Sequence, residues 1–171
     1  MSVRNPTLEG KGIAQPIVLG RVGRVRVLKA SVWLPASVDR VFEFFADAHN
    51  LQSITPEWLS FRVLTPGPIE MGEGTLIDYR ISLRGLPMRW RTRISVWEPG
   101  VRFVDEQVRG PYRLWRHEHT FRAHEGGTMC GDRVEYAHLG GAIGERLIVR
   151  RDLARIFEHR QRRMLELFPP M

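Results

Sequence analysis

The sequence predicts an α+β fold in which a curved antiparallel sheet of about six or seven strands surrounds a long C-terminal helix. Between residues 61 and 138, apolar and polar residues alternate repeatedly, with Gly and Pro between the alternating runs. This is the pattern of hairpin-connected strands with one buried face. Between residues 142 and 168, apolar residues recur at helical spacing. A helix of that length, about 40 Å, would cross the whole sheet.

Composition indicates one globular domain. The chain has 171 residues, of which 43% are hydrophobic and 26% are charged. No run approaches the ~18 consecutive apolar residues of a membrane-spanning helix, and residues 13–19 are interrupted by Gln15 and Pro16, unlike the core of a signal peptide. Cys130 is the only cysteine, which excludes an internal disulfide and suits a reducing compartment. We therefore expect a cytoplasmic protein with no integral membrane segment.

The net charge of +7 is unevenly distributed along the chain. Residues 1–29 contain six basic side chains and one acidic, residues 30–141 contain thirteen and fourteen, and residues 142–171 contain seven and four. The body of the domain is thus close to neutral. Because a nucleic-acid reader concentrates basic and aromatic residues on its main face, we expect no nucleic-acid partner.

The elements follow in order from the local pattern. Residues 1–24 include four glycines and two prolines without a sustained period, so we expect a loosely ordered basic leader and a folded domain at residues 25–171. Alternation at residues 25–34 predicts the first strand. Ser37 then has the position of an N-cap, and helical spacing of the next apolar residues predicts a short amphipathic helix. Residues 50–56 are typical of a turn or a second short helical piece.

Five later runs predict the walls of the sheet, because side chains two residues apart on a strand point to the same face. The inward sets are Thr75, Ile77, Tyr79, Ile81 and Leu83; Trp90, Thr92, Ile94 and Val96; Phe103, Asp105 and Gln107; Trp115, His117, His119 and Phe121; and Thr128, Cys130, Asp132, Val134, Tyr136 and His138.

The final helix has an apolar stripe, and most of its arginines fall on other positions. The stripe comprises Ile143, Leu147, Leu153, Ile156, Phe157, Met164 and Phe168. We assign the arginines, Arg160 among them, to the solvated back of the helix.

Two stretches of the sequence resemble the START-like superfamily, also called SRPBCC, which includes polyketide cyclase/dehydrase and coenzyme Q-binding branches. The first is WLPASVDRVF at residues 33–42, directly after the first strand. The second, residues 97–128, is similar to a bacterial subgroup without an agreed activity. The resemblance covers about residues 25–168 and implies a helix-grip, or Bet v 1-like, fold with a ligand cavity between the sheet and the C-terminal helix. It implies no particular reaction, because one fold hosts many functions.

An aromatic wall with a few polar groups is typical of a small-molecule pocket. We therefore expect a START-like domain that binds a small hydrophobic or amphipathic molecule, such as an aromatic, lipid or polyketide-like compound. The expected ligand-binding residues are Tyr79, Trp90, Phe103, Asp105, Gln107, Trp115, His117, His119, Phe121, Asp132, Tyr136 and Phe157.

Three hypotheses remain for His117 and His119. In the first, both histidines are structural and bonded to Asp105 or Asp132, because a buried carboxylate needs a partner. In the second, they recognise the ligand. In the third, they are catalytic candidates that exchange protons with the ligand, together with those carboxylates. His-x-His with Asp105 or Asp132 as third ligand could also chelate a divalent ion, although we expect neither a cofactor nor a resident metal.

Binding rather than catalysis is the function that this pattern favours. One alternative is an enzyme of the cyclase or dehydratase type that uses the cavity histidines and aspartates as acid and base. Another is a protein-interaction domain whose cavity is vestigial. The sequence determines neither the ligand nor the oligomeric state.

Overall fold

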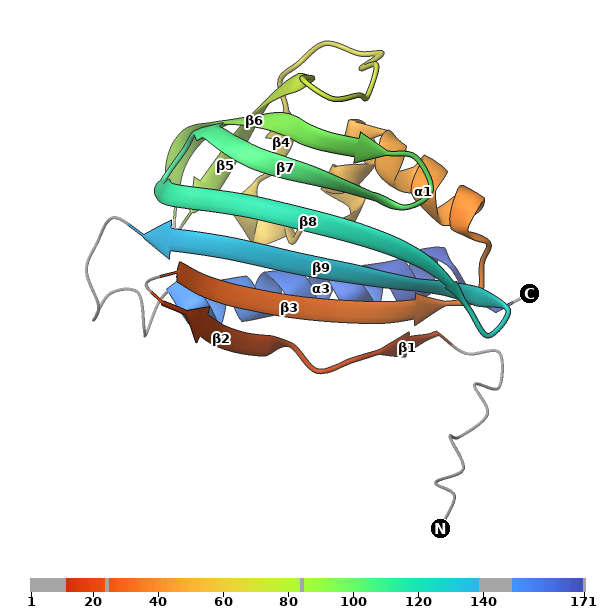
Figure 1. The fold of residues 1–171 in the computed structure, drawn as a ribbon. Coiled ribbons are helices and arrows are strands. Elements are labelled where there is room, and N and C mark those ends of the chain that lie inside the picture. Colours follow the sequence, from red (N-terminus) through yellow and green to blue (C-terminus); the bar gives the residue numbers. More distant parts are fainter. Residues whose placement is uncertain (1–11, 24, 84, 139–148, 171) are drawn as a thin grey trace.

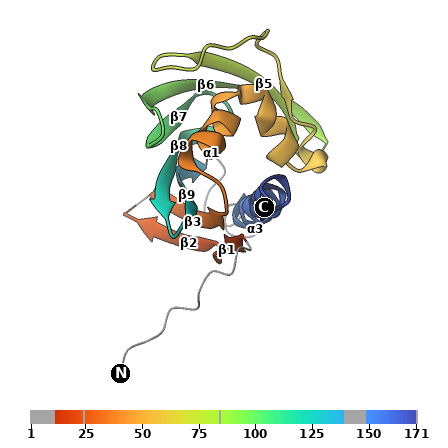
Figure 2. The same cartoon turned by 90° about the vertical axis from the view of Figure 1, so that its right-hand side faces the viewer.

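A computed structural model describes residues 12–23, 25–83, 85–138 and 149–170. Within these residues, nine antiparallel strands form one sheet in the order β1-β3-β9-β8-β7-β6-β5-β4, and β2 also pairs with β3. The sheet curves around the C-terminal helix α3, and α1 and two 3-10 helices lie between the β5–β6 side of the sheet and α3 (Figures 1 and 2). This is the predicted helix-grip architecture, with more strands than the six or seven expected.

The described elements have the following bounds: β1 Ile13–Ala14, β2 Val18–Val22, β3 Val25–Leu34, α1 Val38–Ala46, η1 Ala48–Ile54, η2 Glu57–Leu59, β4 Arg62–Val63, β5 Leu76–Leu83, β6 Leu86–Glu98, β7 Arg102–Arg109, β8 Tyr112–His124, β9 Gly127–His138 and α3 Arg150–Leu167.

The leader differs from expectation. Residues 13–22, predicted to be loosely ordered, form β1 and β2, and both strands pair with β3. The physical reason is that the outer edge of β3 offers unpaired backbone groups, which a neighbouring segment can satisfy. Residues 1–11 and 24 of the predicted leader lie outside the described residues.

The first strand and the first helix are confirmed. β3 covers residues 25–34 as predicted. α1 begins directly after Ser37, whose hydroxyl accepts a hydrogen bond from the backbone N–H of Arg40 at 3.4 Å. This N-cap satisfies one of the free N–H groups of the first turn. Residues 50–56 were predicted as a turn or a second short helical piece, and residues 50–54 of this segment belong to η1.

A β-bulge in β6 corrects one inward assignment. The pairing between β6 and β7 shifts register between Ile94 and Val96, and an extra residue in a strand reverses the faces beyond it. Trp97, rather than Val96, therefore packs into the core, with its ring centroid 5.2 Å from that of Phe42 and 5.5 Å from that of Phe103.

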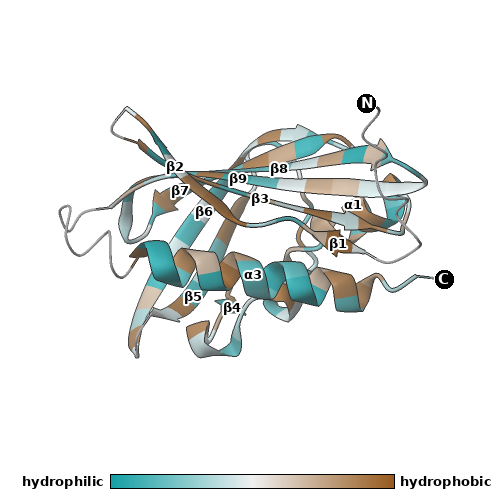
Figure 3. Cartoon of the chain, turned by 90° about the horizontal axis from the view of Figure 1, so that it is seen from below, coloured by the Kyte–Doolittle hydropathy of each residue, from teal (hydrophilic) through white to brown (hydrophobic). Residues whose placement is uncertain are grey.

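The helix α3 lies across the sheet, with hydrophilic and hydrophobic residues alternating along it (Figure 3). Leu153, Phe157 and Met164 are buried as predicted. The earlier part of the predicted helix, with Ile143 and Leu147, lies outside the described residues. Among the helices that the structure describes, none has both the length and the apolar composition needed to span a membrane.

Candidate functional site

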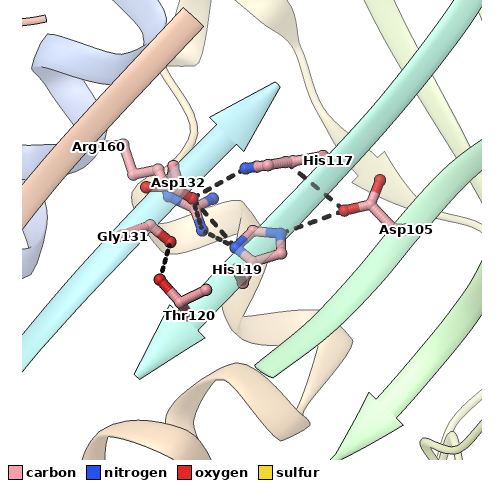
Figure 4. A network of polar contacts seen from close by, with 7 residues as sticks. All are labelled: Asp105, His117, His119, Thr120, Gly131, Asp132 and Arg160. Atoms are coloured by element: carbon pink, nitrogen blue, oxygen red, sulfur yellow. Dashed lines mark hydrogen bonds and ion pairs between the residues drawn. The ribbon is translucent and has the colours of Figure 1, made fainter. Parts of the chain in front are cut away.

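Five ionisable side chains meet between the sheet and α3 (Figure 4). Asp105 comes from β7, His117 and His119 from β8, Asp132 from β9 and Arg160 from α3. Asp105 lies directly opposite His117 in the β7–β8 ladder, and His119 lies directly opposite Asp132 in the β8–β9 ladder. Because directly opposed residues are neighbours on one face of an antiparallel pair, the strand register itself assembles this cluster.

Each histidine lies between the two carboxylates. Asp132 Oδ1 lies 2.8 Å from His117 Nε2 and 3.1 Å from His119 Nδ1. Asp105 Oδ2 lies 3.1 Å from His119 Nε2 and 3.5 Å from His117 Nδ1. Arg160 Nη2 approaches the same Asp132 oxygen at 3.3 Å. Both carboxylates thus meet the histidine partners that the sequence predicted for them.

The hydrogen bonds indicate where the ring protons lie. Arg160 Nη2 is 3.1 Å from His119 Nδ1, and since a guanidinium only donates, this nitrogen accepts. The proton of a neutral His119 ring is then on Nε2, which donates to Asp105 Oδ2. His117 donates from Nε2 to Asp132 Oδ1. In the neutral His117 ring, Nδ1 is therefore an acceptor.

Burial and the neighbouring charges set the ionisation of the cluster. Burial opposes the charge on Asp132, but Arg160 and the two neighbouring histidines outweigh it and hold the pKa of this carboxyl group well below its usual value. Burial also opposes the charge on Asp105, but the hydrogen bond from His119 and the nearby histidines and Arg160 outweigh it and lower the pKa of this carboxyl group. Burial, followed by repulsion from His119, lowers the pKa of His117. Two carboxylates, one guanidinium and a neutral His117 ring thus face one another at neutral pH.

Arg160 corrects a sequence-based assignment. It was placed on the solvated back of the helix, yet only 7% of it is exposed. It follows Phe157 by three positions and precedes Met164 by four, so it shares their face of the helix. This spacing was the sequence signal that could have predicted the burial of Arg160. A buried arginine requires a charged partner, which Asp132 supplies from a distant strand.

A cavity of about 200 Å³ lies beside the cluster. Residues from β5 to β8 form one side, α3 forms another, and α1, η1, η2 and neighbouring loops contribute the rest. Most of the lining is apolar or aromatic, and Trp90 and Trp115 meet in it edge to face with ring centroids 5.0 Å apart. Asp105, His117 and His119 face the cavity along one wall. The site therefore combines a mainly apolar hollow with one concentrated polar wall.

The structure brings most of the predicted ligand-binding residues to this cavity. Those that line it are Tyr79, Trp90, Phe103, Asp105, Trp115, His117, His119 and Phe157.

Four predicted residues lie elsewhere. Gln107 binds the backbone of Tyr112 through both ends of its amide, at 2.7 Å and 3.2 Å, and so closes the turn between β7 and β8. Phe121 packs against Phe42 in the core, with ring centroids 5.3 Å apart. Tyr136 is buried beneath α3, and Asp132 lies behind the histidines rather than in the lining. Strand alternation predicted their face correctly but not how far the hollow extends.

The 3-10 helix η1 contributes lining residues that sequence reasoning missed. Ala48, Leu51 and Ile54 all border the cavity. Their spacing of three residues matches one face of a 3-10 helix. This spacing was a signal in the sequence, but the segment, predicted as a turn or a short helical piece, was not assigned a face.

One subset of the cluster has the composition of a metal site. Asp105, His117 and His119 each offer a ligand atom, and these three atoms lie within 4.8 Å of one another. Imidazole and carboxylate groups are ordinary ligands of divalent transition metals. The cluster can thus donate and accept hydrogen bonds, exchange protons or coordinate a cation at the cavity wall.

Comparison with known proteins places these features in a family context. The sequence profile described as "Polyketide cyclase / dehydrase and lipid transport" matches residues 34–164. No curated protein matches the chain significantly.

Solved structures with the same fold include protein Ms6760 from Mycobacterium smegmatis, with a TM-score of 0.67, 14% identity, and coverage of 91% of this chain and 97% of that one. Major latex-like protein 151 from Panax ginseng has a TM-score of 0.65 and 14% identity, with coverage of 86% and 100%. The di-domain ARO/CYC StfQ from the steffimycin biosynthetic pathway has a TM-score of 0.64 and 16% identity, with coverage of 85% and 51%. At these identities the likeness concerns the fold alone.

Proposed function

Because the chain belongs to the polyketide cyclase/dehydrase and lipid transport family, we propose that it binds a small hydrophobic or amphipathic molecule in the cavity between the sheet and α3. The observation that carries the proposal is the contrast between the mainly apolar lining and the polar wall of Asp105, His117 and His119. Apolar walls favour burial of an apolar body, whereas a few convergent polar groups fix its orientation. The ligand would therefore have an apolar body and one hydrogen-bonding end.

Size and lining narrow the ligand class. A cavity of about 200 Å³ is smaller than the ~300–1,000 Å³ of most ligand pockets, which favours a compact ring system over a long acyl chain. Trp90, Trp115 and Phe103 offer aromatic faces and edges to such a ring. The fold shared with an ARO/CYC protein of a biosynthetic pathway supports an aromatic or polyketide-like compound.

The first experiment is native mass spectrometry of the purified chain before and after denaturation. We expect a retained small molecule that is released on unfolding. Binding of 1-anilinonaphthalene-8-sulfonate, followed by energy transfer from the tryptophans, provides a test that needs no knowledge of the natural ligand.

Thr92→Phe fills the cavity from its wall, and we expect it to weaken binding of this probe at least tenfold. Val101→Phe adds an aromatic ring at an exposed turn and should leave binding unchanged. Equal binding by both variants and the wild type would contradict the proposal and favour a protein-interaction domain.

Proton transfer to the bound molecule is a second candidate function, of the cyclase or dehydratase type. The observation that favours it is the neutral His117, which faces the cavity and donates from Nε2 to the ionised Asp132. A base held in one orientation by a carboxylate is the usual arrangement for general acid–base catalysis. Incubation of the identified ligand with the protein should then yield a cyclised or dehydrated product. Undiminished conversion by the His117→Gln, His119→Gln double variant would disprove this role.

A further inference from the structure

We propose that Asp105, His117 and His119 bind a divalent transition-metal ion, with zinc as the reference case, at the wall of the cavity. Two imidazoles and one carboxylate form a ligand set that suits zinc and its first-row neighbours. The ligand atoms belong to the chain itself, so this inference does not depend on the proposed small molecule. The polar wall of the cavity would then bind a cation as well as form hydrogen bonds.

The distances between the ligand atoms fit a metal centre. Bonds of about 2.0–2.1 Å at tetrahedral angles place neighbouring ligand atoms about 3.3–3.4 Å apart. Asp105 Oδ2 lies 3.1 Å from His119 Nε2 and 3.5 Å from His117 Nδ1. These two separations bracket the required value, and each of the three side chains offers a ligand atom within 4.8 Å of the other two. Only a small movement of the side chains would complete the coordination.

The nitrogens on the far side of both rings already have the partner that metal-bound histidines need. A histidine that binds metal through one nitrogen usually donates its other N–H to a carboxylate, which fixes the ring and its tautomer. His117 Nε2 and His119 Nδ1 both face Asp132 Oδ1, at 2.8 Å and 3.1 Å. When both rings donate to Asp132, their remaining nitrogens present lone pairs on the side of Asp105. Three acceptors that face one another in this way are stabilised by a cation between them.

Arg160 determines the charge of the surroundings. With neutral histidines, the negative charges of Asp105 and Asp132 exceed the single positive charge of Arg160, so the cluster retains one negative charge for a divalent ion. His119 must move its ring proton from Nε2 to Nδ1 on metal binding, which displaces the hydrogen bond from Arg160. That guanidinium lies 3.3 Å from Asp132 Oδ1 and can donate there instead.

Packing holds the two rings in position. The ring of His119 stacks on Phe103 with centroids 4.1 Å apart, and that of His117 meets Phe157 edge to face at 5.4 Å. Because Asp105, His117 and His119 all line the cavity, a coordination position of the ion would be open toward it. Three protein ligands with an open position are typical of sites where the metal meets a substrate.

The test is calorimetric titration of the untagged, chelator-treated full-length protein with zinc chloride. We expect one ion per chain, and at least 100-fold weaker binding in the His117→Ala, His119→Ala double variant. Asp132→Asn should weaken binding by about 10- to 100-fold, as is usual for a carboxylate that orients metal-bound histidines. His124→Ala, on the same strand but outside the cluster, is the matched control and should bind normally.

A second measurement uses only the wild type and thus does not depend on the folding of the variants. Zinc should shift the ¹⁵N resonances of His117 Nδ1 and His119 Nε2, and leave those of His124 and His159 unchanged. Absence of stoichiometric zinc binding, or shifts confined to His124 or His159, would overturn the proposal. The histidines and carboxylates of the cluster would then share only protons. If the wild type binds the fluorescent probe but not zinc, the metal site is refuted and the ligand cavity stands. If it binds zinc but not the probe, the ligand cavity is refuted and the metal site stands.

Discussion

Arg160 on α3 and Asp132 on β9 form an ion pair that joins the terminal helix to the middle of the sheet. Arg160 Nη2 lies 3.3 Å from Asp132 Oδ1, and the two side chains are 8% and 12% exposed. Charges with so little access to water are costly unless they are paired and hydrogen-bonded. The position of the helix over the cavity is therefore coupled to the ionisation of the cluster that lines it.

Substitution Arg160→Met should destabilise the fold, because it leaves Asp132 buried without its compensating charge. Removal of one partner of a buried pair costs about 3–5 kcal/mol in free energy of unfolding. We expect Arg162→Met, at an exposed position of the same helix, to change it by less than about 0.5 kcal/mol. Urea unfolding followed by circular dichroism measures both.

The double variant Arg160→Met, Asp132→Asn separates the charge from the hydrogen bonding. It removes both charges but keeps an oxygen that can accept from His117, so it should be more stable than Arg160→Met alone. If the double variant is the less stable of the two, the penalty does not come from an unpaired carboxylate.

The sequence predicted the histidine–aspartate contacts because they depend on local rules. Alternation placed His117 and His119 on the inward face of one strand, and short hairpins brought Asp105 and Asp132 to the strands on either side. Arg160 could not be placed with the same certainty, because its burial depends on how the helix is rotated and on a partner far away in the chain. Strand pairing is repetitive, whereas helix orientation results from the packing of the whole core.

Other misses have equally specific causes. Val96 was assigned inward because a bulge cannot be recognised from alternation alone, and the bulge turned Trp97 inward instead. Gln107 lies on the predicted face, but its amide bonds the backbone N–H and C=O of Tyr112 in the nearby turn and so does not reach the cavity. The pairing of residues 13–22 depends on an exposed edge of β3, which no pattern within those residues reveals.

Gln107→Ala should destabilise the β7–β8 turn by about 1–3 kcal/mol, because it removes two hydrogen bonds to the backbone of Tyr112. A methyl group at Gly110 would collide with the Gln107 side chain, so Gly110→Ala should displace the amide and cost a similar amount. The double variant should then be no less stable than either single variant, as measured by thermal unfolding. Additive losses would show that the two substitutions act independently.

Cys130 should make stability fall at alkaline pH. Burial, followed by the charge of Asp132, raises the pKa of its thiol to about 12 from an ordinary value of 9.0. The folded state therefore keeps the thiol protonated while the unfolded chain ionises, and the stability it contributes is lost as the pH rises from about 9 toward 12. The slope is up to about 1.4 kcal/mol per pH unit. Urea unfolding at pH 8 and pH 10 should show that the free energy of unfolding falls less in Cys130→Ala than in the wild type. An equal fall in both proteins would show that the thiol is not the cause.

Gln161 should control the attachment of the N-terminal strands. Its side-chain Nε2 donates to the carbonyl oxygens of Gln15 and Ser31, both at 2.9 Å, and so connects α3 to the β1–β2 segment and to β3. Gln161→Leu keeps much of the volume but leaves those carbonyls without this donor, at a cost of about 1–3 kcal/mol.

Because β1 contains only two residues, we expect the lost attachment to appear first as local opening rather than global unfolding. Hydrogen exchange at the Gln15 amide, which donates to Ser31 at 2.9 Å, should accelerate at least tenfold while exchange in β9 stays unchanged. Gln52→Leu, at an exposed position, serves as the control. An unaltered exchange rate at Gln15 in Gln161→Leu would mean that pairing with β3 alone holds the segment in place.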